Sequence, residues 1–491
     1  MQAAPEHFDV LVIGAGLSGI GAACHLQTRC PDKRFIILEG REVSGGTWDL
    51  FRYPGVRSDS DMYTLGYAFR PWREAKAIAD GPAILNYIRE TARLHDVERK
   101  IRYGHKATSA AWSTQDARWT VEVEHAGQAL RFTCDFLFTC TGYYDYASGH
   151  APAFPGAERF QGALVHPQHW PQDLDYTGKR VVIIGSGATA VTLAPAMAGT
   201  AAHVTLLQRS PTYVVARPAE DWLANALKRF LPAKLAYSLT RWRIVLLGMY
   251  FYGLTRRKPA KAKAYILKLL RQQLPGYDIG AHFTPSYNPW DQRLCLVPDA
   301  DLFASIRAGK VSVATDQIET FTETGIRLKS GSELAADVVV SATGLKLQLL
   351  GGMQLRVDGM PVELSRALVY RGMMYSGVPN LASTFGYTNA SWTLKCDLTS
   401  EYVCRLLNHM DRKGYAYCTP TLDDPDIPRQ PLLDFSSGYV QRAVDVLPKQ
   451  GPTPPWRVRQ NYLYDLLSSK LDPIEDGVMA FATRPALEQA A

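Results

Sequence analysis

The sequence has eight cysteines, but no two of them are spaced as a CxxC pair. A zinc ribbon or a thioredoxin-type redox pair requires that spacing, so neither class is indicated. The chain also lacks a basic segment at its start, because MQAAPEH leads directly into an apolar, strand-like run. We therefore expect no signal peptide, free thiols in a reducing compartment, and a cytoplasmic protein.

Acidic residues are missing from residues 222–277, which contain twelve Lys or Arg. The net charge of +7, less these twelve positive charges, leaves −5 for the rest of the chain. The segment includes an apolar run of eleven residues, 244–254, whereas a membrane-spanning helix needs about 20. Two interpretations stay open: peripheral contact with an anionic membrane, or an apolar helix packed over a binding pocket. No nucleic-acid motif accompanies the charge, so nucleic acid is not an expected partner.

The stretch FDVLVIGAGLSGIGAACHL, residues 8–26, has the pattern of a buried strand, a glycine turn and a helix. Gly14 makes the tight turn, Gly16 lets backbone approach a pyrophosphate, and Gly19 lets the helix pack on the strand. The helix N-terminus offers free N–H groups to phosphate. Glu39 ends the next strand, 23 residues after Gly16, where a carboxylate accepts both ribose hydroxyls. This unit predicts a site for an unphosphorylated adenosine, such as that of FAD.

A second unit, RVVIIGSGATAVTLAPAMA, covers residues 180–198. In its second strand, HVTLLQRSP, Gln208 occupies the place that Glu39 holds in the first unit, and Arg209 follows. A neutral glutamine does not repel a 2′-phosphate, and an arginine pairs with one bidentately. We therefore assign NADPH to this unit. Its expected contacts are Gly185, Ser186, Gly187, Thr189, Ala190, Arg209 and Ser210.

Two similar segments, DFLFTCTG at 135–142 and DVVVSATG at 337–344, are expected to close the two units. The predicted fold class is therefore α/β, with two Rossmann-like dinucleotide-binding domains and a helical insertion. The expected domains are an FAD-binding domain at 1–150 and 346–491, an NADPH-binding domain at 151–345, and a helical insertion at 215–285.

The stretch FQGALVHPQHWP, residues 160–171, stands just before the second glycine loop. It fits FxGxxxHxxxW(P/D), and the chain resembles the Baeyer–Villiger monooxygenases along nearly its whole length, in particular the branch that contains the ethionamide-activating monooxygenase. Related N- and S-oxygenases usually lack the tryptophan. The resemblance implies a linker that fixes how the two domains meet, not a catalytic site. Its marked residues are Phe160, Gly162, His166, Trp170 and Pro171.

The segment GGTWDLFRYPGVRSDSDMYTLGY, residues 45–67, carries further candidates. Gly45 and Gly46 allow backbone to pass close to a flat ring system, and Trp48 supplies a packing face. We assign Gly46, Thr47 and Trp48 to the flavin cofactor. A further segment, residues 377–398, is expected to end a strand and open a helix near 388–391. The N-terminus of that helix either stabilises a reduced flavin through its dipole or is a capped structural helix.

The resemblance also assigns a catalytic pair. Asp59, four residues after the glycine of YPG, and Arg293, in NPWDQRLCLVPD, match the family's motifs, and Asp59 is expected to contact the cofactor as well. Asp61 is a rival carboxylate that only the motif distinguishes from Asp59. Gln292 stands where the family usually has lysine, so one expected contact to the 2′-phosphate is missing.

The implied reaction depends on FAD and NADPH and inserts one oxygen atom of O2 into a ketone, giving an ester or lactone. Sulfur compounds are further expected substrates, and no metal is expected. Arginine stabilises negative charge in such a reaction without readily losing its proton, since its pKa exceeds about 12. The alternatives are a flavin-dependent N- or S-oxygenase and a non-catalytic, NADPH-sensing flavoprotein. The sequence predicts no oligomeric state.

Overall fold

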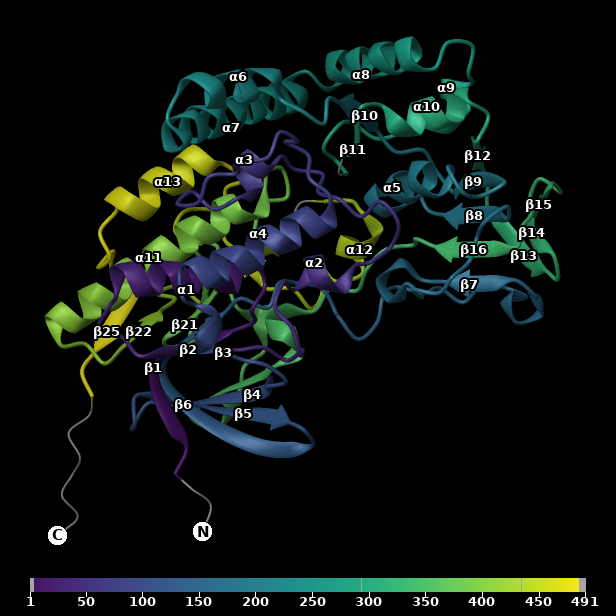
Figure 1. The fold of residues 1–491 in the computed structure, drawn as a ribbon. Helices are drawn as coiled ribbons and strands as arrows, with labels where there is room; N and C mark the ends of the chain where they lie inside the picture. Colours follow the sequence, from purple (N-terminus) through teal and green to yellow (C-terminus); the bar gives the residue numbers. More distant parts are fainter. Residues whose placement is uncertain (1–3, 293, 434, 485–491) are drawn as a thin grey trace, which may run out of the picture.

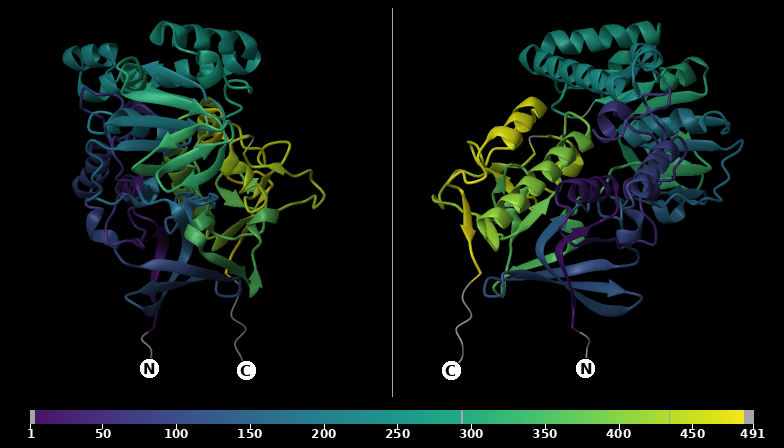
Figure 2. Two further views of the ribbon diagram at one scale, coloured as in Figure 1. Left: turned by 90° about the vertical axis from the view of Figure 1, so that its right-hand side faces the viewer. Right: turned by 60° about the vertical axis from the view of Figure 1, so that its left-hand side comes forward.

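The computed structural model describes residues 4–292, 294–433 and 435–484. Figure 1 shows two separate sheets with a layer of helices above them, and Figure 2 shows the same arrangement from two other sides. Both ends of the described chain lie on the same side of the molecule, near the first sheet. The fold is α/β with two Rossmann-like units, as the sequence predicts.

The first sheet takes its strands from both ends of the chain. Its parallel part has the order β3-β2-β1-β6-β21. An extension continues from β6 through β5 and β4, which pair antiparallel, to β17, which pairs with β4 in parallel, and ends at β18. The four residues from Val10 to Ile13 in β1 are buried, as expected for a strand covered on both faces. The bounds are β1 (Glu6–Ile13), β2 (Phe35–Leu38), β3 (Ile101–Arg102), β4 (Lys106–Ser113), β5 (Arg118–His125), β6 (Gln128–Thr139), β17 (Gln354–Val357), β18 (Met360–Pro361) and β21 (Leu381–Ser383).

Two helices from opposite ends of the sequence pack together on this sheet. They are α1 (Leu17–Arg29) and α11 (Trp392–Lys413), which lie side by side in Figure 1. The strand and helix expected within residues 377–398 are β21 and α11, and Ser391 is the residue before the first turn of α11. All eight cysteines are free thiols, as predicted, and all are buried.

The second sheet is wholly parallel, with the order β12-β9-β8-β16-β7. Helix α5 (Ala188–Met197) packs against its core, and the small sheet of β13, β14 and β15 covers other apolar residues, among them Val182 and Val339. The strand bounds are β7 (Ala163–Val165), β8 (Arg180–Ile184), β9 (His203–Gln208), β12 (Val311–Thr315), β13 (Ile318–Thr322), β14 (Gly325–Leu328), β15 (Glu333–Ala335) and β16 (Val338–Ser341).

The two glycine loops are built alike. The amide of Gly14 donates to the carbonyl of Leu38 at 2.8 Å, and that of Gly185 donates to Leu207 at the same distance. Glu39 and Gln208 therefore occupy equivalent positions, as the sequence predicts. Gly14 has φ +102° and Gly185 has φ +138°, which L side chains rarely adopt. A Cβ at either position would also meet a carbonyl of the closing segment, at 2.8 and 2.4 Å.

A helical insertion leaves the second unit between two paired strands, β10 (Val214–Arg217) and β11 (Cys295–Pro298). Residues 215–217 belong to β10, so the helical part begins later than the expected residue 215. It comprises α6 (Trp222–Phe230), α7 (Ala233–Arg257), α8 (Pro259–Gln273) and α9 (Ile279–Phe283). None of the helices in the described ranges combines the length and apolar character that crossing a bilayer requires.

The stretch from Phe160 to Pro171 supplies β7, the edge strand of the second sheet. A Cβ at Gly162 would lie 2.4 Å from the carbonyl oxygen of Asp337, so this close approach requires glycine. The His166 ring lies against Gly149, where a Cβ would meet it at 2.0 Å. The amide of His150, which follows Gly149 in the chain, donates to the carbonyl of Gly344 at 3.1 Å. His166 thus lies where the two connections between the sheets run side by side.

Candidate active site

A cavity of about 810 Å³ lies at the carboxyl ends of β1, β2 and β6. Ligand sites in proteins usually measure about 300–1,000 Å³, and this edge of a parallel sheet is where nucleotides bind. The described wall includes Ile13, Leu38 and Cys140 at the strand ends. The site residues predicted from the sequence that the structure brings together here are Gly14, Gly16, Glu39, Gly46, Thr47, Trp48, Asp59 and Thr189.

Two backbone amides hold the Glu39 carboxylate in the wall of the cavity. Its Oε2 accepts from the amide of Ala15 at 2.7 Å, and its Oε1 accepts from the amide of Arg41 at 3.0 Å. Burial raises the pKa of this carboxyl, while the two amides act in the opposite direction. Helix α1, which follows Gly16, has no side-chain cap and no acidic residue in its first turn. Its N-terminal amides and dipole are therefore available to an anionic group.

The GGTW segment closes over the glycine loop. Gly46, at φ +55°, stands before α2 (Thr47–Leu50), and a Cβ on it would lie 3.0 Å from the Cα of Gly16. The backbones of Gly16 and Gly46 therefore approach each other closely. The Thr47 hydroxyl lies 3.1 Å from the hydroxyl of Tyr146, which fixes the first turn of α2 against the opposite wall.

A buried carboxylate organises the arginines beside this segment. Asp49 is 3% exposed and lies 2.5 Å from Arg41, 2.8 Å from Arg89 and 3.4 Å from Arg52. Burial alone would raise the pKa of Asp49, but the three guanidinium groups hold it below its ordinary value. Arg41 lines the cavity, so Asp49 fixes a positive charge at its wall. The sequence interpretation did not identify either residue, although Arg41 stands only two positions after Glu39.

The YPG turn connects the cavity to the second unit. Tyr53 is buried in the apolar core around α5, and a Cβ at Gly55 would meet the Ala196 methyl group at 2.6 Å. Asp59 then lines the cavity. Asp61 does not: it is 5% exposed and caps α3 (Met62–Leu65) by accepting from the Thr64 amide at 3.0 Å. Of the two rival carboxylates, only Asp59 therefore belongs to the described cavity wall.

The second glycine loop reaches the cavity only at its edge, through Ala188 and Thr189. Gly185, Ser186 and Gly187 are not part of the cavity wall, and Ala190 is buried in α5. Helix α5 also starts without a side-chain cap or an acidic first turn. Arg209 and Ser210 are exposed just beyond β9. Of these residues, Gly187, Arg209 and Ser210 are exposed, and together with Gly185 and Ser186 they are called here the surface site next to the cavity.

Gln208 faces inward. Its amide nitrogen donates to the carbonyl of His282 at 2.6 Å and to the hydroxyl of Thr315 at 2.9 Å. Gln208 is 3% exposed. Its side chain is therefore bonded within the protein, whereas the equivalent Glu39 faces the cavity. The sequence correctly predicts the missing carboxylate, but only the structure shows these internal partners.

Two other sets of sequence candidates do not line the cavity. The fingerprint residues Phe160, Gly162, His166, Trp170 and Pro171 are absent from its described wall. Arg293, the proposed catalytic arginine, lies outside the described residues, while Leu296 of β11 does line the cavity. Among the residues that the structure describes, no group of three or more His, Cys, Asp or Glu side chains is arranged to hold a metal ion.

Several wall residues had no sequence motif to identify them. They come from the loop after β6, from the connection after β16, from the turn before α11 and from the first residue of α11. The only local signal is the aromatic run GYYDY directly after the closing strand. These residues are Tyr143, Tyr144, Tyr146, Gln348, Tyr387 and Trp392.

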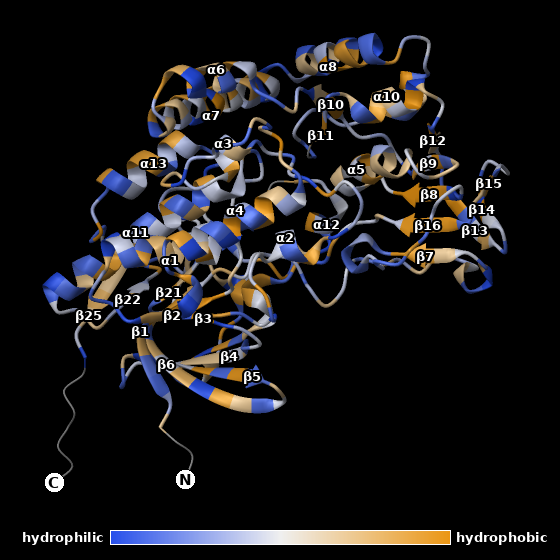
Figure 3. Ribbon diagram, viewed as in Figure 1, coloured by the Kyte–Doolittle hydropathy of each residue, from blue (hydrophilic) through white to orange (hydrophobic). Residues whose placement is uncertain are grey.

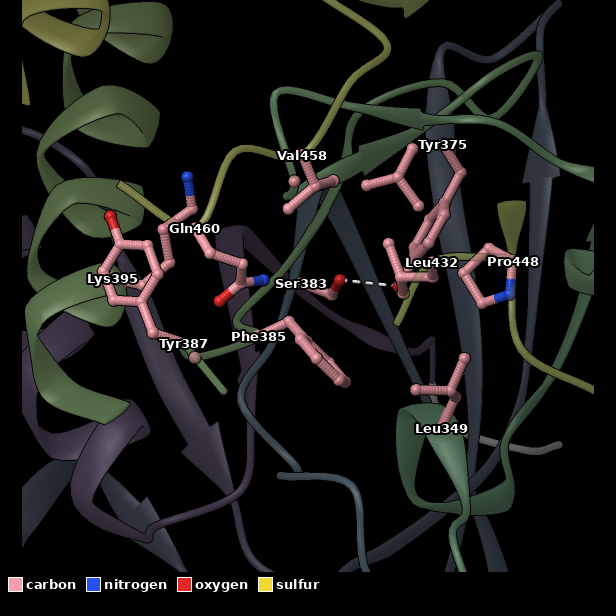
Figure 4. Close-up of a pocket in the computed structure, with 13 residues that line it drawn as sticks. Leu349, Tyr375, Ser383, Phe385, Tyr387, Lys395, Leu432, Pro448, Val458 and Gln460 are labelled. Carbon is pink, nitrogen blue, oxygen red and sulfur yellow. Dashed lines mark hydrogen bonds between the residues drawn. The ribbon is translucent and has the colours of Figure 1, made fainter. Parts of the chain in front are cut away.

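Tyr387 also borders a second, much smaller cavity of about 20 Å³, which has room for about one water molecule. Figure 4 shows this cavity, with Tyr387 and Lys395 at one end and Leu432 and Pro448 at the other. The hydroxyls of Tyr375 and Ser383, marked by the dashed line, lie 2.7 Å apart. Tyr387 is therefore shared between the walls of both cavities.

Two Rossmann-like folds whose glycine loops both border one cavity define the class of proteins with two dinucleotide-binding folds. Residues 77–350 match the family described as flavin-binding monooxygenase-like, and residues 12–79 match the NAD(P)-binding Rossmann-like domain. The first match covers more than half of the 491 residues. The chain belongs to the flavin-binding monooxygenase-like family.

The chain is also similar to individual monooxygenases. The chain is 55% identical to the FAD-containing monooxygenase EthA of Mycobacterium tuberculosis, over 98% of this chain and 99% of that protein. Its fold is similar to the structure described as oxidized steroid monooxygenase bound to NADP, with a TM-score of 0.75, 22% identity, and coverage of 97% and 100%. It is also similar to the open crystal structure of cyclohexanone monooxygenase, with a TM-score of 0.70, 21% identity, and coverage of 85% and 90%.

Proposed function

We propose that this protein is a Baeyer–Villiger monooxygenase that uses FAD, NADPH and O2 to convert ketones into esters or lactones. The observation that carries the proposal is the single cavity bordered by the first glycine loop, by Asp59 and by Thr189 of the second loop. A hydride donor, a redox cofactor and a substrate must meet in one place for this reaction. The relative named as FAD-containing and the neighbours named for NADP and for cyclohexanone support the same assignment.

FAD is assigned to the cavity itself. Glu39 would accept from the ribose hydroxyls, and the uncapped N-terminus of α1 would hold the pyrophosphate. Gly46, Thr47 and Trp48 would border the ring system, and the Arg41 charge fixed by Asp49 favours an anionic cofactor. The wall fits this group in size and in its donor set. The domain that would hold FAD comprises residues 1–150 and 346–491.

NADPH is assigned to the surface site of the second unit, within residues 151–345. The backbone of Gly185, Ser186 and Gly187 and the start of α5 would hold its pyrophosphate. Arg209 and Ser210, both exposed, would bind the 2′-phosphate, and Gln208 presents no carboxylate to repel it. Thr189 and Ala190 follow the loop, so the nicotinamide end would reach the cavity past Thr189.

Reduced flavin, when bound, supplies the electrons that activate O2. The chain's own task is to stabilise the negative charge that develops as oxygen is transferred to the carbonyl carbon. We assign this to Arg293, with Asp59 orienting the guanidinium through a charge-assisted hydrogen bond. Trp170 and the other fingerprint residues are assigned to the contact between the two domains, since His166 packs beside both connecting segments.

The test is a product assay with purified protein carrying its flavin. A methyl ketone, a sulfide and an amine are each incubated with NADPH, and the products are identified by mass. Ester from the ketone supports the proposal, and sulfoxide from the sulfide extends it to sulfur. Amine or sulfide oxidation without any ester would favour an N- or S-oxygenase. NADPH consumption that no substrate stimulates would favour a sensor. Arg293→Ala serves as the control: it should keep FAD but form about 10²–10³-fold less ester.

A further inference from the structure

The helices α6, α7 and α8, called here the basic helical layer, expose an unusual amount of apolar surface. Figure 1 shows them as the layer farthest from the first sheet, and Figure 3 shows orange apolar segments among blue ones within it. Twelve of the nineteen exposed large apolar side chains in the described ranges belong to this layer. They are Trp222, Phe230, Leu235, Leu239, Trp242, Leu246, Leu247, Tyr250, Phe251, Leu254, Tyr265 and Leu269.

In α7 the exposed apolar side chains gather along one face of the helix. Leu235, Leu239, Trp242, Leu246 and Tyr250 recur at the spacing of one helix face, and all are exposed. The opposite face is anchored in the protein, because the Arg241 guanidinium donates to the carbonyls of Tyr63 at 2.8 Å and Gly66 at 2.7 Å.

The anchored face also reaches the main cavity. Val245, buried on this side of α7, packs with Tyr387 of the cavity wall and with Leu394. One face of α7 therefore packs against the cavity wall, and the other presents apolar side chains outward.

The charges of the layer have one sign. Within residues 222–277 there are twelve Lys or Arg and no Asp or Glu. Ion pairs join three of them to acidic residues outside the segment, namely Asp397, Asp221 and Asp291. Seven others are exposed and form no ion pair with another described residue. These seven are Arg229, Lys234, Arg257, Lys258, Lys261, Lys268 and Arg271.

We propose that the basic helical layer docks the protein on an anionic lipid bilayer. Exposed apolar and aromatic side chains would enter the interface, and the seven free cations would lie at the level of the lipid phosphates. Tryptophan and tyrosine, here Trp222, Trp242, Tyr250 and Tyr265, favour this boundary because they have an apolar body and a polar group.

Charge decides between a bilayer and a second copy of the chain. A symmetric dimer through this layer would bring the same cations against each other, with no acidic residue in the segment to pair with them. A bilayer containing anionic lipid supplies the missing negative charge. The apolar run is eleven residues long, so the layer would lie in the interface and not cross the membrane.

The test is co-sedimentation of the full-length protein with vesicles of phosphatidylcholine alone and of an equal mixture with phosphatidylglycerol. We expect binding to the mixture at low salt and weaker binding at high salt, because salt screens the charges. Arg257→Gln/Lys258→Gln should weaken binding on the order of tenfold. Leu246→Gln/Tyr250→Gln, whose parent side chains are 49% and 64% exposed, should lose most of it.

Two control variants replace the same kinds of exposed side chain, apolar in one and cationic in the other, outside the basic helical layer. Leu94→Gln/Met360→Gln replaces side chains that are 73% and 71% exposed, and Arg412→Gln/Lys413→Gln removes two exposed cations at the end of α11. Both controls should bind as the original protein does. Absence of binding at low salt, or equal losses in the controls, would overturn the proposal. So would Leu246→Gln/Tyr250→Gln converting a dimer to a monomer in light scattering without any vesicle binding, which would identify a self-association surface.

Discussion

The Lys395 ammonium group lies 2.8 Å from Asp465 Oδ2, and the two side chains are only 7% and 10% exposed. The hydroxyl of Tyr387 donates to the same oxygen at 2.7 Å, and Lys395 also donates to the Arg371 carbonyl at 3.3 Å. The pair joins α11 to α13 (Tyr462–Leu471). Through Tyr387 this buried network extends to the walls of both cavities (Figure 4).

We predict that Lys395→Met strongly destabilises the protein. Removing one partner of a buried pair leaves the other charge without compensation, which costs about 3–5 kcal/mol. The double variant Lys395→Met/Asp465→Leu should lose less than the sum of the two single variants. Urea unfolding followed by tryptophan fluorescence measures both quantities. The surface pair Arg327–Glu333, at 47% and 51% exposure, is the control: Arg327→Met should cost less than about 1 kcal/mol. Equal losses in both pairs would contradict the argument.

The parts of the fold that the sequence predicts are those where a local requirement determines the residue. Gly14 and Gly185 must adopt a positive φ beneath a carbonyl of the closing segment, so the glycine loops are recognisable from their letters alone. The equivalence of Glu39 and Gln208 follows from the same short units. The start of α11 directly after Ser391 is also predicted, although residues 384–391 separate it from the end of β21.

Contacts between distant segments could not be predicted in this way. Lys395 and Asp465 are 70 residues apart, and nothing local marks either one as buried. The distinction between Asp59 and Asp61 depends on where α3 begins. Asp61 stands directly before its first turn, so the Asp61 carboxylate accepts a hydrogen bond from a backbone amide of that turn. The fingerprint stretch predicts a connection between domains, but its pairing as β7 depends on β16, almost 180 residues later. Tertiary packing decides each of these.

Arg209→Ala should discriminate between the two nicotinamide coenzymes. If the exposed guanidinium binds the 2′-phosphate, its loss removes a charge-assisted contact worth about 1.5–3 kcal/mol. The KM for NADPH should therefore rise about 10- to 100-fold, while the KM for NADH hardly changes. Steady-state kinetics with each coenzyme measures both values. Arg307→Ala, which removes an exposed arginine from α10 (Asp301–Arg307), is a control that should affect neither. Equal losses for both coenzymes in Arg209→Ala would mean that the 2′-phosphate binds elsewhere.

FAD affinity should depend on pH through Glu39. Burial raises its pKa above the ordinary value of 4.5, and a protonated carboxyl accepts fewer hydrogen bonds than a carboxylate. The Kd for FAD should therefore increase as pH falls through this pKa. Glu39→Gln, which does not titrate, should bind FAD about 10-fold or more weakly, with no such dependence. Titration of the FAD-free proteins by flavin fluorescence, at pH values from about 4 to 8, measures this. A flat profile for the unaltered protein would contradict the assignment.

The same raised pKa has the opposite effect on the FAD-free protein. Because the folded state holds the Glu39 proton more tightly than the unfolded state does, its contribution to stability is largest below pH 4.5. That contribution is lost as pH rises through the folded-state pKa. The difference in unfolding free energy between the FAD-free original protein and Glu39→Gln should therefore become less favourable to the original protein across this range. Urea unfolding at several pH values measures the slope, and a slope of opposite sign would contradict it.

The last prediction separates the two carboxylates next to the cavity. Asp59→Ala should retain FAD and still oxidise NADPH, but release more hydrogen peroxide and form less ester, because the proposed catalytic arginine keeps its charge and loses its orientation. Asp61→Ala should leave the ester yield nearly unchanged and lower the unfolding free energy by about 1 kcal/mol, since Asp61 caps α3 through the Thr64 amide. The deciding measurement is ester formed per NADPH consumed, taken at equal flavin occupancy. If Asp61→Ala uncouples the reaction and Asp59→Ala does not, the catalytic carboxylate has been assigned to the wrong residue.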